Sequence, residues 1–342
     1  MLISTSLNYA GGFKESADRV ADLEQAGFDI VFVAEAYGFD AVSQMGYIAA
    51  KTSTIKIGSG ILPIYSRTPT LLAQTAAGLD ALSDGRMILG LGASGPQVIE
   101  GWHGVPYNKP LERTREIIDI CRRVWRREVV SHDGLYKLPL PPEQGTGLGK
   151  PLKMITHPVR SSIPIWVAAI GPKNVQMTAE VADGWLPVFF IPERVKDVWG
   201  DALAKGMANR SPDVGPFDIC APGLVAIGDG MEHVRDMMRP MAALYIGGMG
   251  ARGRNFYNSL AQRYGFEAEA KHIQDLYLDG KKEEAAAAVP AELLEKTTLI
   301  GPPGYVKERL AAYKEAGVTA LSATIIDADP RRVVEQLKEW SA

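Results

Sequence analysis

Small residues follow three apolar runs of the chain, where they could bind a flat ring and its phosphate. Ser59-Gly60-Ile61 ends one run, Ala93-Ser94 follows a second, and Ala168-Ala169-Ile170-Gly171 ends a third. Small side chains let a ring approach the backbone. The third segment joins a predicted strand to a predicted helix, and free amides at a helix N-terminus attract phosphate. These features predict an anion-binding loop at residues 168–171, and a tight turn without a ligand is the alternative.

Two carboxylates are candidates for proton chemistry. Glu35 ends the apolar run that begins at Ile30. It could act as a general acid, as an orienting hydrogen-bond acceptor, or as half of an ion pair with Arg67. Glu100 is the weaker candidate, because this residue and the nearby His103 could be ordinary loop surface.

Other classes of site have little support. The segment Gly90–Gly95 fits the GxGxxG dinucleotide fingerprint, but Gly101, Gly104 and Pro106 leave room for only a short helix after it. The five histidines lack metal-site spacing and the two cysteines form no CxxC pair, so we expect no metal. A net charge of −3 without a long basic run argues against nucleic-acid or membrane partners. No signal peptide or membrane span is evident, and we expect a cytoplasmic protein that acts on a small molecule.

The elements that position these residues follow a repeated pattern. A helix-like stretch ends at a small or acidic residue and a glycine, and an apolar strand follows, at Gly27, Gly85, Gly184 and Gly317. Such a glycine can adopt the left-handed conformation that ends a helix. The strands are continuous apolar runs, which is typical of a parallel sheet covered on both faces.

Eight strands and eight helices are predicted in strict alternation. The strands lie near 2–7, 28–35, 55–61, 87–92, 165–169, 184–188, 219–227 and 320–326. The helices lie near 14–26, 40–52, 69–82, 111–126, 174–182, 193–209, 305–316 and 330–340. This order predicts an α/β fold, a single (β/α)8 TIM barrel over residues 1–342, and an open doubly wound sheet is the alternative.

Two segments, near 128–163 and 231–297, exceed what a minimal barrel needs. Insertions of this kind usually lengthen the loops of the catalytic face, although they could also be packing or dimer elements. In a barrel the carboxyl ends of the strands form that face. The strand ends would bring together Ser6, Asn8, Tyr9, Glu35, Tyr37, Ser59, Gly60, Ile61, Tyr65, Arg67, Ala93, Ser94, Gly95, Glu100, His103 and residues 168–171.

The sequence resembles the bacterial-luciferase-like superfamily, and within it the coenzyme F420-dependent oxidoreductases of the methylenetetrahydromethanopterin reductase-like branch. The resemblance rests on eight segments in one order and spans nearly the whole chain, with residues 231–297 covered least. The segments are Ile57-Gly58-Ser59-Gly60-Ile61, Arg67-Thr68-Pro69, Leu79-Asp80, Ser83-Asp84-Gly85-Arg86, Leu89-Gly90-Leu91-Gly92, Val167 through Gly171, Ala182-Asp183-Gly184-Trp185, and Glu315-Ala316-Gly317-Val318.

This resemblance implies a barrel that is usually a homodimer, with a flavin or deazaflavin at its mouth. It further implies a non-proline cis peptide at Gly60-Ile61 behind the ring, contacts from Ala93 and Ser94, and the coenzyme phosphate at residues 168–171. The implied activity is hydride transfer between F420 and an unidentified small substrate. For this activity our own hypothesis places Glu35 near the ring and assigns proton handling to Glu100.

Two departures from the family pattern bear on the substrate. Similar sugar-phosphate dehydrogenases carry His and Glu where this chain has Ala36 and Gly95. Oxidation of a sugar phosphate is therefore not expected. An FMN-dependent monooxygenase and a non-catalytic flavin-binding protein are the alternative functions.

Overall fold

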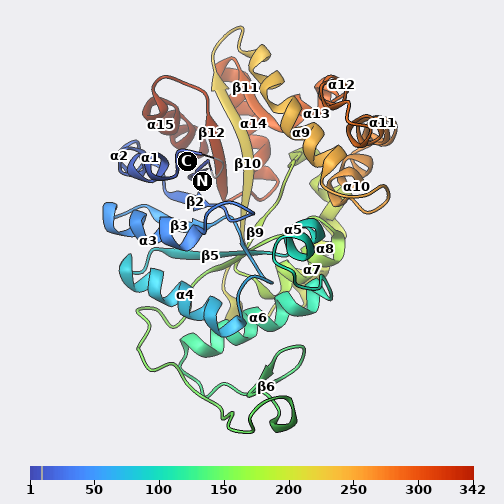
Figure 1. The fold of residues 1–342 in the computed structure, drawn as a ribbon. Coiled ribbons are helices and arrows are strands. Elements are labelled where there is room, and N and C mark those ends of the chain that lie inside the picture. The colour runs from blue at the N-terminus through green and yellow to red at the C-terminus, as the bar shows by residue number, and fades with distance from the viewer. Residues whose placement is uncertain (9–10) are drawn as a thin grey trace.

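Eight parallel strands of the described chain close into a barrel (Figure 1). The computed structural model describes residues 1–8 and 11–342, so Tyr9 lies outside the described residues. The barrel strands are β1 (Leu2–Ser6), β2 (Ile30–Val33), β3 (Lys56–Ser59), β5 (Met87–Gly92), β8 (Ile165–Ala168), β9 (Gly184–Leu186), β10 (Asp218–Ile227) and β12 (Ala320–Ile325). They pair in this order, and β10 pairs with both β9 and β12. This closure confirms the predicted TIM barrel and excludes the open sheet.

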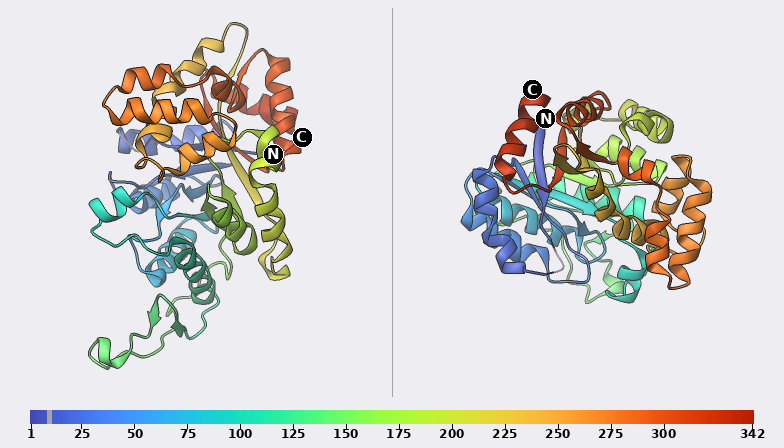
Figure 2. Two further views of the ribbon diagram at one scale, coloured as in Figure 1. Left: turned by 90° about the vertical axis from the view of Figure 1, so that its right-hand side faces the viewer. Right: turned by 90° about the horizontal axis from the view of Figure 1, so that it is seen from above.

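Helices cover the outside of the barrel, close to the predicted positions (Figure 2). They are α1 (Phe13–Asp18), α2 (Val20–Gln25), α3 (Ala41–Lys51), α4 (Pro69–Leu82), α6 (Pro110–Trp125), α7 (Pro172–Val181), α8 (Val195–Ala208), α14 (Pro303–Glu315) and α15 (Pro330–Ser341). The single helix expected at 14–26 is two short helices that meet at Arg19. Two of these helices have ordinary N-caps, since the Asp40 carboxylate accepts from the Ser43 amide at 2.8 Å and Thr68 precedes Pro69.

The glycines of the repeated pattern have two different structural roles. Gly27, Gly85 and Gly317 have φ of 92°, 83° and 88°, the left-handed conformation expected after a helix. Gly184 does not share it and lies inside β9. A Cβ there would come within 2.6 Å of the Trp166 ring, which fills the barrel interior beside Phe32. Gly184 therefore makes room for this buried tryptophan rather than ending a helix.

The insertion at 231–297 is helical, as expected, and follows the carboxyl end of β10. It contains α9 (Arg239–Ala243), α10 (Phe256–Arg263), α11 (Glu267–Leu278), α12 (Lys282–Ala287) and α13 (Ala291–Lys296). A strand that the sequence did not predict, β11 (Thr298–Gly301), follows and pairs with the carboxyl half of β10. The insertion thus extends the catalytic face of the barrel.

The segment 128–163 does not lengthen the catalytic face directly, contrary to the expectation. It joins the end of α6 to the start of β8, and Figure 2 shows it projecting from the body of the barrel. Its hairpin, β6 (His132–Asp133) and β7 (Lys137–Leu138), folds back along α6. There the Glu116 carboxylate accepts from the Leu135 and Tyr136 amides at 3.0 and 3.1 Å. Among residues 1–8 and 11–342, no helix has both the length and the apolar character needed to cross a bilayer.

The start of β3 is held by one carboxylate. Glu24 Oε1 accepts from the amides of Ser53 and Ile55 at 2.9 and 2.8 Å, and from the amide and hydroxyl of Thr54. Burial tends to raise the pKa of Glu24, but these hydrogen bonds outweigh it and lower the pKa to about 2.

We expect Glu24 to make the fold sensitive to acid. Since its pKa is lower in the folded chain than in the unfolded one, its contribution to stability is complete above about pH 4.5 and is lost as the pH falls toward about 2. Urea unfolding at several pH values should show wild type above Glu24→Gln near neutrality, with the gap in unfolding free energy closing over this window. A gap that stays constant with pH would contradict this role.

Candidate functional site

The three small-residue segments lie side by side at the mouth of the barrel. β3 pairs with β5 and β5 pairs with β8, with Gly58 opposite Ile88 and Leu91 opposite Val167. The segments that follow these strands are therefore neighbours, as predicted. The peptide bond between Gly60 and Ile61 is cis, which agrees with the conformation that the resemblance implied.

Glycines on β5 let the Gly60-Ile61 segment lie close against it. A Cβ at Gly90 would lie 1.7 Å from the Ser59 carbonyl oxygen, and a Cβ at Gly92 would lie 2.8 Å from Ile61 Cγ1. Glycine is required at both positions because β5 and the Ser59–Ile61 segment lie so close together. Ser59 is fully buried, and its hydroxyl donates to the Gly90 carbonyl and accepts from the Gly90 amide, both at 2.8 Å. Its side chain thus joins two strands and does not face a ligand.

The residues that follow the strands border accessible space. Gly60, Ile61, Ala93, Ser94 and Ala168 are partly exposed, whereas most of the residues of the strands behind them are buried. Ser94 has φ of 57°, which is unusual for a residue with a side chain and is found mostly at turns and functional sites. This conformation aims its carbonyl at the Tyr107 hydroxyl, 3.4 Å away.

Residues 168–171 fit an anion. The Ala169 carbonyl accepts from Trp185 Nε1 at 2.8 Å, and the Ile170 carbonyl accepts from Trp199 Nε1 at 2.8 Å and from Arg263 at 3.3 Å. The carbonyls are therefore occupied by donors of the scaffold. Among the described residues, no acceptor is found for the amides of Ile170 and Gly171, which precede the ten-residue helix α7. Free amides at the positive end of a helix dipole suit a phosphate.

Glu35 forms the ion pair that was one of its three interpretations. Its Oε1 and Oε2 accept from Arg67 Nη1 and Nη2 at 2.6 and 2.8 Å, and Oε2 also accepts from the Ala41 amide at 3.0 Å. Hydrogen bonding to Glu35 raises the pKa of Arg67 above its usual value, against the effect of burial. The Glu35 amide donates to the Ile61 carbonyl at 3.3 Å. The pair therefore braces the loops on either side of the Gly60-Ile61 segment.

Glu100 and its neighbours lie on a short helix after β5. This helix, α5 (Pro96–Gly101), has only six residues, as the glycines predicted, and it cannot serve a dinucleotide as the fingerprint requires. Glu100 is exposed, and its Oε1 accepts from the Tyr107 amide at 3.1 Å. His103 Nε2 is buried without a hydrogen-bond partner among the described residues, while Trp102 is exposed rather than part of the core.

An aromatic wall that the sequence reasoning missed includes Tyr257, which follows Phe256 in the chain, and the Phe256 ring lies 3.9 Å from a Cβ built at Gly171. The Phe189 ring contacts the rings of Tyr245 and Tyr257, with centroids 5.9 and 6.4 Å away, and Tyr245 and Tyr257 are 4.7 Å apart. Burial, with Tyr245 and Tyr107 nearby, raises the pKa of Tyr257. Phe189 follows β9, so the strand-end rule could have selected it. The two tyrosines belong to the insertion, where no local pattern predicts which side chains face the mouth.

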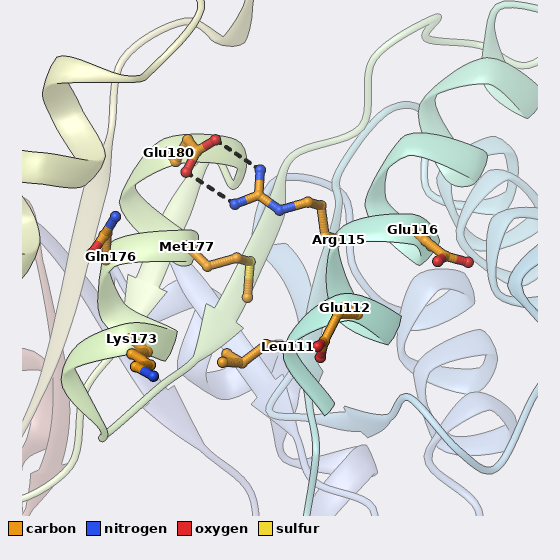
Figure 3. A pocket seen from close by; sticks show the side chains of 8 residues that line it. All are labelled: Leu111, Glu112, Arg115, Glu116, Lys173, Gln176, Met177 and Glu180. Atoms are coloured by element: carbon orange, nitrogen blue, oxygen red, sulfur yellow. Dashed lines mark hydrogen bonds and ion pairs between the residues drawn. The ribbon is translucent and has the colours of Figure 1, made fainter. Parts of the chain in front are cut away.

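A hollow on the outside of the barrel is not part of this site. It measures about 530 Å³ and lies between α6 and α7, and Figure 3 shows Leu111 and Met177 beside the ion pair of Arg115 and Glu180. Its helices cover the outer surface, whereas the strand ends described above open at the mouth.

The two cysteines lie in the interior of the protein. Cys121 and Cys220 are free and fully buried, and burial raises the pKa of the Cys220 thiol to about 12. Among the residues that the structure describes, no cluster of His, Cys, Asp or Glu is arranged to hold a metal ion.

Comparisons with known proteins agree with this geometry. Residues 2–320 match the sequence model of luciferase-like monooxygenases. The chain is 43% identical to a Mycobacterium tuberculosis protein named as a coenzyme F420-dependent oxidoreductase, over 97% of both chains. It is 29% identical to the 5,10-methylenetetrahydromethanopterin reductase of Archaeoglobus fulgidus, over 88% of this chain and 86% of that one. The solved F420-dependent tetrahydromethanopterin reductase of Methanopyrus kandleri superposes with a TM-score of 0.79 and 21% identity, over 98% and 96% of the chains, which shows the shared fold.

Proposed function

Since the chain belongs to the luciferase-like monooxygenase family, we propose that it is an oxidoreductase that binds coenzyme F420 at the barrel mouth and transfers a hydride between the coenzyme and a small organic substrate. The observation that carries this proposal is the convergence of residues 60–61, 93–94 and 168–171 on neighbouring strand ends. The relative with 43% identity supports F420 as the coenzyme.

The residues at the mouth fit this coenzyme. Gly60 and Ile61 would support one face of the ring, and the absence of a side chain at Gly92 leaves room for Ile61 there. Ala93 and Ser94 would lie along the ring edge, and the amides of Ile170 and Gly171 would bind the phosphate. The small side chains of Ala168 and Ala169 let the phosphate approach the backbone of that loop. When bound, F420 supplies a hydride carrier that exchanges two electrons at a time.

The carboxylates have separate roles in this proposal. Glu35 acts as a positioning residue, because Arg67 and the Ala41 amide already occupy both of its oxygens. Glu100 has one oxygen bound by the Tyr107 amide and is open to solvent, so it is placed to exchange protons between water and the mouth.

Titration of the purified protein with F420 and with FMN tests the proposed coenzyme. We expect saturable F420 binding, followed by fluorescence quenching, and FMN binding at least about tenfold weaker. Tight FMN binding without F420 binding would instead support a monooxygenase, which the name of the matched family favours. Binding of either coenzyme without turnover of any substrate would support a flavin-binding protein.

Replacing Glu35 with glutamine should weaken F420 binding by about tenfold, which corresponds to about 1.4 kcal/mol. The change removes one charge of a largely buried pair, in which Glu35 and Arg67 expose 8% and 15% of their side chains. The loops on either side of the Gly60-Ile61 segment would then be held less firmly. The Kd for F420 and the rate of reduced-F420 oxidation are the measurements, and values equal to wild type in both would remove the role of Glu35.

We also propose that the protein acts in the cytoplasm as a homodimer. Two buried free cysteines suit a reducing compartment. The projecting segment 128–163 exposes large apolar side chains, including Leu148, Leu152 and Ile155, that a second copy could cover. Sedimentation at micromolar concentration should give the mass of two chains, and the mass of one chain would contradict the dimer.

A further inference from the structure

Exposed aromatic side chains are confined to one face of this protein. Among the described residues, four aromatic side chains are classed as exposed: Tyr37 at 68%, Phe39 at 73%, Trp102 at 66% and Phe256 at 60%. Tyr37 and Phe39 lie between β2 and α3, Trp102 follows α5, and Phe256 begins α10. Every one of them lies on a connection that leaves the carboxyl end of a barrel strand. These four residues form the aromatic rim.

The rim adjoins the proposed coenzyme site. A Cβ at Gly171 would lie 3.9 Å from the Phe256 ring, so this ring stands beside the phosphate loop. Trp102 follows the same strand as Ala93 and Ser94. Tyr37 lies two residues after Glu35. The rim therefore comes from three connections around the mouth rather than from one helix face.

Two charged side chains next to the mouth are held by other groups of the protein, whereas Glu100 is exposed. The Glu35 carboxylate is bound by Arg67, and the Arg263 guanidinium donates to the Val198 and Ile170 carbonyls and lies over the Trp199 ring. The inner wall is formed by Phe189, Tyr245 and Tyr257, and burial makes ionisation of Tyr257 more difficult. An uncharged molecule would lose little hydration on contact with these rings, whereas a charged group would give up water that the rings do not replace.

We propose that the substrate is a bulky, uncharged molecule with aromatic or hydrocarbon parts, and that the aromatic rim binds these parts while the reacting carbon reaches the coenzyme. This inference rests on the proposed function. A small molecule is favoured over a second protein copy, because a protein that covered Phe256 and Trp102 would close the mouth through which coenzyme and substrate enter. Large apolar surfaces that border a ligand site commonly bind ligand.

Equilibrium dialysis can test the substrate class without turnover. Three probes are compared on the protein saturated with oxidised F420: benzylideneacetone with one ring, chalcone with two, and 4-carboxychalcone with an added charge. We expect chalcone to bind at least about tenfold more tightly than benzylideneacetone, since burial of an aromatic ring favours binding strongly. The carboxylate of 4-carboxychalcone should cancel this gain in affinity. Equal affinities, or tightest binding of the carboxylate, would overturn the proposal.

Substitutions in the rim test whether its side chains cause this difference in affinity. Trp102→Ala and Phe39→Ala should each lower the chalcone-to-benzylideneacetone affinity ratio by about five- to tenfold. Leu82→Ala is the matched control, because Leu82 is 67% exposed but ends α4, at the opposite end of the barrel. It should leave the ratio unchanged. A ratio that responds equally to all three changes would contradict a role for the rim.

The same samples separate this inference from the proposed function. Dialysis of F420 itself reports coenzyme binding, and failure of that binding would overturn the proposed function, while the probes on the coenzyme-free protein would still report the preference of the rim. Sedimentation of Trp102→Ala and Phe39→Ala tests whether a second copy of the protein covers the rim instead. A loss of dimer together with an unchanged affinity ratio would show that the rim is a subunit interface and would overturn the proposal.

Discussion

Gly92→Val will lower the affinity for F420 by about 100-fold while the barrel remains folded. Even a Cβ at this position comes within 2.8 Å of Ile61 Cγ1 and 3.0 Å of Ile61 Cδ1, so valine must push Ile61 and the segment behind the ring toward the mouth. Overpacking of this kind costs about 1–3 kcal/mol, less than the stability of most domains. The Kd for F420, with urea unfolding of the same sample, measures both effects.

The matched control for this prediction is Gly78→Val. Gly78 lies on α4 with no atom within 4 Å of an added Cβ, so the same chemical change meets open space. It should leave the F420 affinity within about twofold of wild type. The account of the ring support would be wrong if Gly92→Val bound F420 as wild type does, or if Gly78→Val weakened binding as much.

Arg160→Met will lower the unfolding free energy by about 3–5 kcal/mol. Arg160 Nε lies 3.1 Å from both carboxylate oxygens of Asp80, Nη2 also binds Asp80, and Asp80 is completely buried. Removal of the guanidinium leaves a buried carboxylate without its partner, which is strongly destabilising. The pair joins α4 to the end of the projecting segment, beside the start of β5. Urea unfolding at neutral pH measures the loss.

Two further variants test the cause. Arg194→Met removes an exposed pair with Asp197, in which the side chains expose 54% and 66% and the atoms are 3.4 Å apart. It should cost less than about 0.5 kcal/mol. Asp80→Asn combined with Arg160→Met should recover part of the stability, because no unpaired charge remains. A loss below about 1 kcal/mol in Arg160→Met would show that Asp80 does not depend on this partner.

The barrel could be predicted because its local signals agree. Apolar runs, glycines after helices and strict alternation marked all eight barrel strands. The strand β11 was missed because Thr298–Gly301 directly follows a helical stretch, without a glycine between them. The hairpin β6–β7 has two residues in each strand and depends on Glu116 from α6, a contact that no local pattern records.

The convergence of the strand ends could be predicted, but the contacts of their side chains could not. Strand-end reasoning brought Gly60, Ser94 and Gly171 to one mouth, because register follows from parallel pairing. It could not decide between the three interpretations of Glu35, since its partner Arg67 is 32 residues away. It also could not show that the Ser59 hydroxyl is directed at Gly90. The tyrosines of the wall come from an insertion whose packing depends on tertiary contacts alone.

A crystal structure of the complex with F420 would show directly whether the coenzyme binds at the barrel mouth. We expect the ring to lie against Gly60 and Ile61, with Ser94 at its edge and the phosphate at the amides of Ile170 and Gly171. A ring bound outside the barrel mouth, for example in the hollow between α6 and α7, would contradict the account. So would a phosphate bound away from residues 168–171.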